Sequence, residues 1–475
     1  MPLQSTLDYI VDRSALLQKL SDAIWETPEL GLHESRSSAV LADALEEAGF
    51  QVERGVAGMP TAFTATFGSG APVVALLGEF DALPGLSQAR GATEHQPLVA
   101  EGPGHGCGHN LLGTGAAAAA MAVKDAIERG EVSGTVRFYG CPAEEILVGK
   151  VFMVRAGLFD DVDCAFSWHP SSVNGVWATN LLAMNSATFT FKGISAHAAG
   201  DPENGRSALD AVELMNTGVN YLREHVPSTT RIHYVITDGG LAPNVVPNRA
   251  QVWYYVRAPR RTDVEEIYER VLDIARGACL MTGTSHEVRL LCGCYDTLAN
   301  HALGEALHAN LAAIGAPPFT DDEKEFARRL QGSFPEGALA KELRNLKKRG
   351  VQLGGAGEEG TELHEGVAPH EGYGESGGGS TDVGDVSYSV PTAQINTATS
   401  PLGTPGHSWQ NVVASGSSIG QQGMVLAAQV LAATVCDVMT RPELLAKAKE
   451  EFASATAESP YVSPVRDVEK PPLDI

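Results

Sequence analysis

The chain has 475 residues, which is enough for two or three domains with sizeable cores. Hydrophobic residues make up 43% of it and the formal net charge is −24, so a globular protein is expected. The negative charge speaks against nucleic acid and anionic membranes as partners, since both require a basic surface. The longest apolar run, 424–439, is too short to span a bilayer.

The cysteines and the N-terminus indicate the compartment. Seven cysteines, an odd number, are widely scattered, which favours a reducing environment over a disulfide framework. The N-terminus lacks the basic and apolar regions of a signal peptide. A cytoplasmic protein is therefore expected.

Strands that alternate with helices are expected in the first 180 residues. Two helices, at 7–25 and 35–48, precede apolar runs with the length and bounds of buried strands: 73–77, 135–139 and 164–167. The alanine-rich segment 111–128 has the pattern of a helix. This order predicts an α/β domain with a mainly parallel central sheet flanked by helices.

Polar residues follow each of these strands directly. In chain order they are Glu79 and Asp81, then Glu144 and Glu145, then His169. An adjacent glutamate pair is ordinarily solvated, and a histidine between tryptophan and proline is ordinarily a satisfied core residue. Here all five come at the carboxyl ends of strands, where open α/β sheets bind ligands, which favours a site.

The glycine-rich segment 102–110 precedes the alanine-rich helix. It alternates glycines with His105, Cys107 and His109, side chains that suit transition metals. The alternative is a glycine turn with solvated histidines and a buried cysteine. No matching cysteine pair follows, as a zinc finger would require, so any further ligands must come from distant parts of the chain.

The composition and the spacing of apolar residues change after Trp177. Segments 184–295 read as βαββαβ, which predicts an inserted, smaller α+β domain of ferredoxin-like type. Residues 1–183 and 296–475 would then form one discontinuous catalytic domain. The charge- and glycine-rich stretch 319–376, including 354–360, is expected to be a long surface flap, and 415–439 the final helix.

Seven motifs occur in an order that matches a known family. They are Gly-Glu-Phe-Asp-Ala-Leu-Pro (78–84), Gly-His-Gly-Cys-Gly-His-Asn (104–110), Pro-Ala-Glu-Glu (142–145), Trp-His-Pro (168–170), Gly-Ile-Ser-Ala-His-Ala-Ala (193–199), Ala-Pro-Asn-Val-Val-Pro (242–247) and Pro-Gly-His-Ser (405–408). Over roughly residues 10–440 the chain resembles the two-metal aminoacylase/carboxypeptidase (peptidase) family, in its amidohydrolase branch. It is most similar there to the B-type subunits of aminobenzoyl-glutamate hydrolases.

The resemblance implies a metal site and its chemistry. Two divalent ions, Zn or Mn, would be bound by Cys107, His109, Glu145, His169 and His407. Glu144 matches the general base. Asp81 would orient a ligand or site water, as groups beside metal ligands commonly do. Glu79 departs from the family, because carboxypeptidase relatives have a metal-binding histidine there; His105 has no assigned role, and the bridging ligand is left open.

The resemblance also implies how substrate is bound. His197 of the inserted domain matches a histidine that reaches into the site of the partner protomer, so a homodimer is expected, with the inserted domain serving for dimerisation and as a lid. Asn244 and Arg257 match substrate-binding positions, often for a carboxylate.

The expected activity is hydrolysis of the amide bond of an N-acyl or N-aroyl amino acid, such as aminobenzoyl-glutamate, by a metal-activated water. The first alternative is a dipeptidase or exopeptidase on the same scaffold. The second is a non-catalytic metal-binding protein that keeps the fold. The acyl group, the amino acid, the metal and any need for a second kind of subunit stay open at this point.

Overall fold

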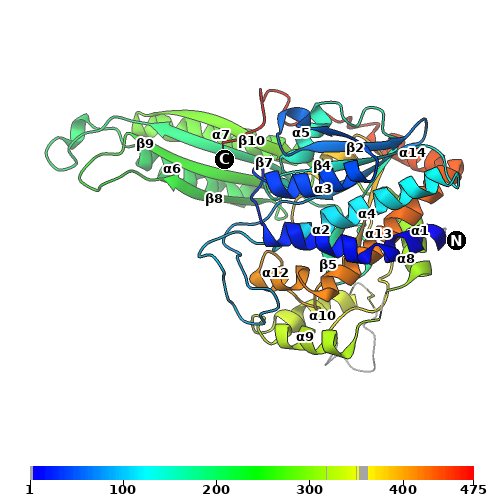
Figure 1. Cartoon of the computed structure of the whole chain (residues 1–475). Helices are drawn as coiled ribbons and strands as arrows, with labels where there is room; N and C mark the ends of the chain where they lie inside the picture. The colour runs from blue at the N-terminus through cyan, green and yellow to red at the C-terminus, as the bar shows by residue number, and fades with distance from the viewer. Residues whose placement is uncertain (1–3, 317, 349, 352–361, 475) are drawn as a thin grey trace. The chain divides into compact units, whose positions relative to one another are not determined.

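The computed structural model describes residues 4–316, 318–348, 350–351 and 362–474. These residues form two compact units (Figure 1). Unit 1 comprises the described residues of Met1–Thr179, Leu298–Glu375 and Val386–Tyr461. Unit 2 comprises Asn180–Thr297, Ser376–Asp385 and 462–474. The expected mixed α/β architecture is confirmed.

Unit 2 contains the inserted segment 184–295 and also two short segments that the sequence placed in the catalytic domain. The Leu182 N–H donates to the Gly379 carbonyl, and the Tyr295 N–H donates to the Asp385 carboxylate. Arg289 and Asp474 form an ion pair. Contacts between residues so far apart in the chain leave no local pattern, which is why the sequence did not reveal these additions.

The sheet of unit 1 has seven strands in the order β1-β2-β4-β3-β5-β11-β6. Its centre is parallel: β3 (Val73–Glu79) pairs with β4 (Thr135–Cys141) and β5 (Cys164–Ser171), and β5 pairs with β11 (Thr392–Ala398). The antiparallel strands at its edges are β1 (Gln51–Arg54), β2 (Phe63–Gly68) and β6 (Gly175–Val176). The carboxyl ends of β3, β4 and β5 therefore meet at one edge.

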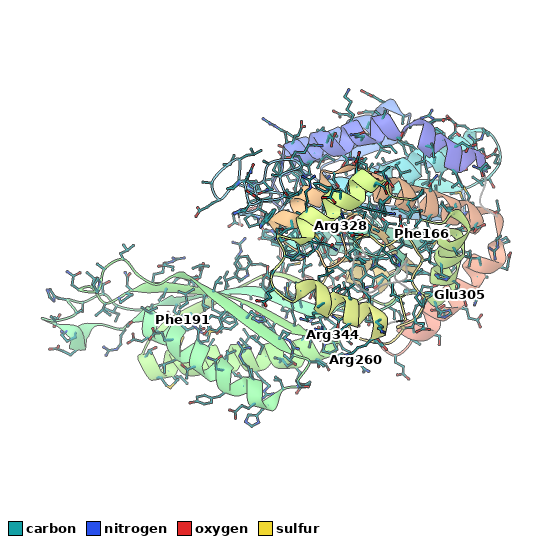
Figure 2. All side chains as sticks on the ribbon, turned by 90° about the horizontal axis from the view of Figure 1, so that it is seen from below. Phe166, Phe191, Arg260, Glu305, Arg328 and Arg344 are labelled. Carbon is teal, nitrogen blue, oxygen red and sulfur yellow. The ribbon has the colours of Figure 1, made fainter. Side chains whose placement is uncertain are left out.

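Helices α4 (His109–Glu128) and α13 (Ser418–Thr440) run side by side against this sheet (Figure 1). The alanines of α4 allow close approach to α13 and the strands, and Phe166 of β5, labelled in Figure 2, is fully buried in the same core. The other helices of unit 1 are α1 (Gln4–Asp12), α2 (Ser14–Glu26), α3 (Ser35–Glu47), α5 (Gly149–Arg155), α8 (His301–Ile314), α9 (Asp321–Gln331), α10 (Ala338–Lys348), α12 (Trp409–Ser415) and α14 (Pro442–Thr456).

Helix α13 is 23 residues long and apolar enough, by length and composition, to cross a membrane. It is longer than the apolar run 424–439 suggests. Within the described chain its most apolar window is 78% buried, as in the core helix of a folded domain. It packs on α4, α8 and β11.

Several element boundaries differ from the sequence expectation. The helix expected at 7–25 is interrupted at Arg13 into α1 and α2, and α14 follows the helix expected to be the last. Residues 168–170 lie within β5 rather than after it, because β11 continues to pair with β5 as far as Ser171. In the expected flap 319–376 the chain forms α9 and α10, while 354–360 lies outside the described residues.

Unit 2 carries a four-stranded antiparallel sheet in the order β10-β7-β9-β8. Along the chain its elements are β7 (Ala183–Lys192), α6 (Ala208–Leu222), β8 (Arg231–Asp238), β9 (Arg249–Ala258), α7 (Arg261–Thr282) and β10 (Ser285–Cys294). Both helices pack against β7 and β9, and Phe191 is buried in the core between them (Figure 2). This is the βαββαβ order expected from the sequence.

Candidate metal centre

Three neighbouring strands of unit 1 deliver polar side chains to one edge of the sheet. β3 ends at Glu79 and is followed by Asp81, β4 leads into the turn that carries Glu144 and Glu145, and β5 carries His169 near its end. In a parallel sheet such ends form the usual ligand site. The glycine-rich segment before α4 adds Cys107 at this edge, as its contact with His169 shows.

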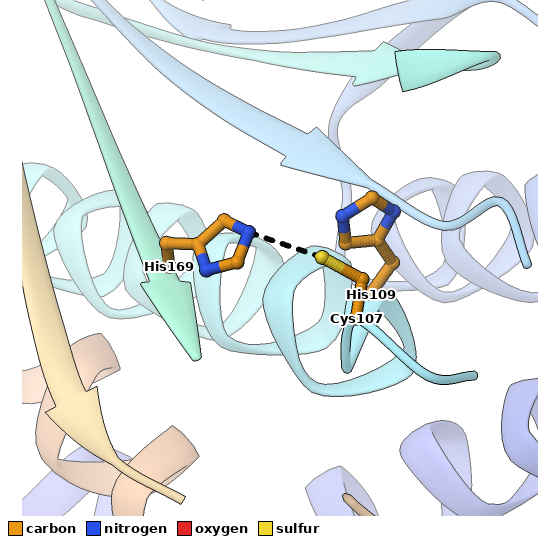
Figure 3. Close-up of side chains that lie close together, drawn as sticks. All are labelled: Cys107, His109 and His169. Carbon is orange, nitrogen blue, oxygen red and sulfur yellow. Dashed lines mark hydrogen bonds between the residues drawn. The ribbon is translucent and has the colours of Figure 1, made fainter. Parts of the chain in front are cut away.

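The five residues expected to bind metal fall into two groups that share Cys107. One group is Cys107, His109 and His169, and the other is Cys107, Glu145 and His407; in each group the ligand atoms all lie within 4.8 Å of one another. Figure 3 shows the first group, with the Cys107 sulfur beside the His169 ring. Cys107 is the residue that these two groups have in common.

Hydrogen bonds at Nδ1 fix the orientation of the His109 and His169 rings. His109 donates from Nδ1 to Asp81 Oδ1 over 2.9 Å, and His169 donates from Nδ1 to the Pro170 carbonyl over 2.7 Å. With Nδ1 engaged as the donor, each ring directs Nε2 at the site, which is the atom through which it would bind a metal. Burial and the neighbouring His109 lower the pKa of His169 to about 4, so it is neutral.

Buried atoms that lack partners show that these residues fit a cation. His109 is fully buried, and among the described residues neither its Nε2 nor Oε1 of Glu145 has a hydrogen-bond partner. Burial raises the pKa of Glu145 to about 7 and raises that of the Cys107 thiol well above its usual range. A divalent ion would satisfy these atoms and hold both groups deprotonated.

The separations between donor atoms agree with this interpretation. Cys107 Sγ lies 3.3 Å from His169 Nε2, and Glu145 Oε2 lies 3.4 Å from His407 Nε2. Two ligand atoms each about 2.1 Å from a tetrahedral ion lie about 3.4 Å apart. His407 is the exposed member, with 59% of its side chain accessible, and its φ of 51° is unusual for a residue with a side chain.

The expected general base lies beside the first group. Glu144 is 8% exposed, and its Oε2 is 3.8 Å from His109 Nε2. Asp81 contacts one residue of each ligand group. Its Oδ1 accepts the hydrogen bond from His109 Nδ1, and its Oδ2 accepts the Glu145 N–H over 2.9 Å.

Two other residues at this edge make contacts that the sequence did not indicate. Glu79 forms a buried ion pair with Lys150 of α5, with 2.8 Å between Oε1 and Nζ, and its Oε2 lies 3.4 Å from His109 Nε2. In the sequence, the only indication of this ion pair is a single lysine, Lys150, within the apolar run of α5. His105 donates from Nε2 to the Ile24 carbonyl, and burial lowers its pKa to about 3, so it ties the segment to α2 as a neutral ring.

The expected substrate residues belong to unit 2. His197 is exposed, and its Nδ1 accepts the N–H groups of Ala199 and Gly200. The Asn244 carbonyl accepts the Ala198 N–H, so His197 and Asn244 lie in adjoining loops. Arg257 lies near the end of β9, with its guanidinium 5.1 Å from the centre of the Tyr255 ring.

Comparison with known proteins identifies the family. Residues 183–280 match the model described as the peptidase dimerisation domain of M20 enzymes. The chain is 46% identical over 459 residues to the B-type subunit of p-aminobenzoyl-glutamate hydrolase from Escherichia coli, covering 96% of this chain and 95% of that protein. The chain belongs to the M20 peptidase family. The resemblance found in the sequence is thereby confirmed.

Two further similar proteins span nearly the whole chain. Xaa-Arg dipeptidase of Mus musculus is 30% identical over 452 residues, which cover 92% of this chain and 88% of that protein. A dinuclear metal-binding peptidase of the M20 family from Bacillus subtilis has the same fold, with a TM-score of 0.55 and 17% identity over 90% of this chain and 98% of that one. The chain described here is thus a metal-dependent hydrolase of linear amides, as expected from its sequence.

Proposed function

We propose that this M20 enzyme hydrolyses the amide bond of an N-acyl or N-aroyl amino acid, with aminobenzoyl-glutamate as the first substrate to test. The observation that carries the proposal is the pair of ligand groups sharing Cys107, with Glu144 beside them. The substrate class is supported by the E. coli relative, which is named for aminobenzoyl-glutamate and is 46% identical.

Two divalent ions held by the residues of these groups would lower the pKa of a water molecule and polarise the scissile carbonyl. Glu144 takes the proton from that water and passes it to the leaving nitrogen. Asp81 keeps His109 in the tautomer that presents Nε2 and holds the backbone at Glu145. A thiolate ligand favours Zn on grounds of softness, and Mn is the alternative.

Substrate binding and assembly are assigned to unit 2. We propose that Asn244 and Arg257 bind the substrate carboxylate and that His197 polarises the scissile carbonyl in the site of a second copy of this chain. The dimerisation-domain match over residues 183–280 supports an oligomer. The E. coli relative is named as one of the subunits of its enzyme, so activity is best assayed with the chain alone and with any co-purifying protein.

A dipeptidase activity is the second candidate, because Xaa-Arg dipeptidase matches 92% of the chain at 30% identity. Parallel assays of aminobenzoyl-glutamate and of simple dipeptides distinguish the two. Faster turnover of the dipeptides would reverse the preference.

We also propose a cytoplasmic location, since all seven cysteines are free thiols in the described chain.

Elemental analysis combined with turnover of wild type and Glu144→Ala tests the mechanism. We expect about two metal ions per chain in both proteins and a loss of turnover by several orders of magnitude in the variant. Loss of metal together with activity would make Glu144 a ligand instead of a base. Wild type without bound metal after reconstitution would overturn the site assignment.

A further inference from the structure

Glu34 is a fully buried carboxylate next to the turn that carries Glu144 and Glu145. It comes just before α3, and each of its oxygens has a partner in another part of unit 1. Oε1 accepts the Ala143 N–H over 2.8 Å, and Oε2 accepts the Thr61 hydroxyl over 2.9 Å. It is not a member of either ligand group around Cys107.

The turn that Glu34 contacts has an unfavourable backbone conformation. Ala143 has φ 56° and ψ 38°, and Leu147 has φ 60° and ψ 37°, so a left-handed residue with a side chain lies on each side of the two glutamates. Such conformations persist only where surrounding contacts impose them. The turn therefore depends on its neighbours for its shape.

Two buried carboxylates supply these contacts at different points of the turn. Glu34 accepts the N–H of Ala143, and Asp81 accepts the N–H of Glu145. Glu144 lies between these two anchored N–H groups. Its side-chain direction is thus determined by backbone that is hydrogen-bonded on both sides.

Close packing on the Glu34 side reinforces this arrangement. A Cβ added at Gly31 would lie 3.0 Å from Ala143 Cα and 3.1 Å from Ala143 Cβ. Only glycine allows the segment 31–34 to approach the turn so closely. The segment 31–34 thus packs directly against the turn and supports its conformation.

Glu34 contributes through its hydrogen bonds more than through its charge. Burial, with the negative charge of Asp81 in addition, raises the pKa of Glu34 to about 8. A carboxyl group in this state resembles a glutamine amide in shape and in the oxygen it offers to Ala143.

We propose that Glu34 is a positioning residue, which fixes the turn at Ala143 so that Glu144 is aligned as the base and Glu145 as a metal ligand. This role rests on the proposed function of those two glutamates. It assigns to the loop before α3 a part in catalysis, although that loop contributes no side chain to either ligand group around Cys107.

Three substitutions test the reach of this side chain. Glu34→Gln keeps the reach and an acceptor oxygen and cannot ionise. Glu34→Asp keeps a carboxyl group but withdraws it by one methylene, and Glu34→Ala removes the group. We expect kcat and the affinity for one metal ion to fall about 10- to 100-fold in the alanine and aspartate variants, and to stay within about threefold of wild type in the glutamine variant.

Glu29 provides a matched control in the same segment. Its carboxylate accepts the N–H groups of Arg36 and Ser37 at the start of α3, over 3.0 and 2.9 Å. Glu29→Ala should lower the thermal unfolding temperature, as loss of any such contact does, and leave kcat unchanged. A fall in kcat caused merely by a weaker fold would appear in this variant too.

The measurements are kcat and KM for aminobenzoyl-glutamate, metal affinity by competition with a chelator, and thermal unfolding. Low kcat with unchanged KM and weaker metal binding in Glu34→Asp, restored in Glu34→Gln, supports the role. Wild-type kcat and metal affinity in Glu34→Asp, or equal defects in the glutamine and aspartate variants, overturn it. If Glu34→Ala does not fold, the other two variants decide. Wild type that binds two metals but cleaves no amide contradicts the proposed function, and metal affinity still tests Glu34.

Discussion

At the scale of residues, Asp81 supports two parts of the candidate metal centre at once. It is buried, and its two oxygens accept hydrogen bonds from the ring of His109, a proposed metal ligand, and from the backbone N–H of Glu145. Burial alone would raise the pKa of Asp81, but the hydrogen bond and charge of His109 outweigh this effect and hold the pKa below its ordinary value. An ionised carboxylate is what both N–H donors require.

Replacement of Asp81 by asparagine tests this double role. The amide offers one acceptor oxygen, and its NH₂ group can turn His109 to the wrong tautomer. We expect metal affinity and kcat to fall about 10- to 100-fold, as for other partners of metal-bound histidines. Chelator competition and steady-state kinetics would show this; unchanged metal affinity would argue against the tautomer role.

Glu34 gives a prediction for stability against pH. Its pKa is about 8 when folded, against an ordinary 4.5, so between these values the folded state retains a proton that the unfolded state has released. Wild type should therefore lose stability as pH rises through this window. In metal-free protein, Glu34→Gln should gain stability relative to wild type from about pH 5 to about pH 8.5 by urea unfolding. A difference independent of pH would contradict the assignment.

At the scale of elements, the turn after β4 and the helix α5 act together. α5 starts at Gly149, directly after the turn, and brings the fully buried Lys150 to Glu79 at the end of β3. The ion pair thus joins the element that follows the catalytic turn to the strand that precedes Asp81. It anchors the turn at a third point.

Replacement of Lys150 alone should lower stability more than replacement of both members of this ion pair. Lys150→Met leaves the Glu79 charge unpaired in the core, and we expect about 3–5 kcal/mol of lost stability. The double variant Lys150→Met with Glu79→Gln should recover a large part of it. Denaturant unfolding of the single and double variants measures the coupling. Purely additive losses would show that the two side chains do not depend on each other.

At the scale of the whole molecule, the proposed dimer predicts recovery of activity on mixing inactive variants. Chains with His197→Ala retain Glu144, and chains with Glu144→Ala supply His197. In mixed dimers one site is then complete, so activity should return to about a quarter of wild type after random exchange. Mixing Glu144→Ala with Asp81→Asn is the control, because neither site of that hybrid is complete. No recovery in the first mixture would exclude the shared site.

The strands that carry the proposed site can be predicted from the sequence because strands and their flanking residues are local patterns. The run 73–77 has the form of a buried strand, and the polar residues after it, Glu79 and Asp81, lie at the edge where such strands bind ligands. The order of elements likewise predicted the parallel sheet and the βαββαβ insertion, both of which the structure contains. Membership of the M20 family followed from motifs in register and is confirmed.

The sequence by itself determined the kinds of side chain available and the strands that deliver them, since both depend on short-range pattern. Only the tertiary structure decided which partners those side chains have. Glu34 is 109 residues from Ala143, and Glu79 meets Lys150 from a different element. Such pairs form because a buried carboxylate must find a donor wherever the fold brings one near, and no periodicity records that requirement.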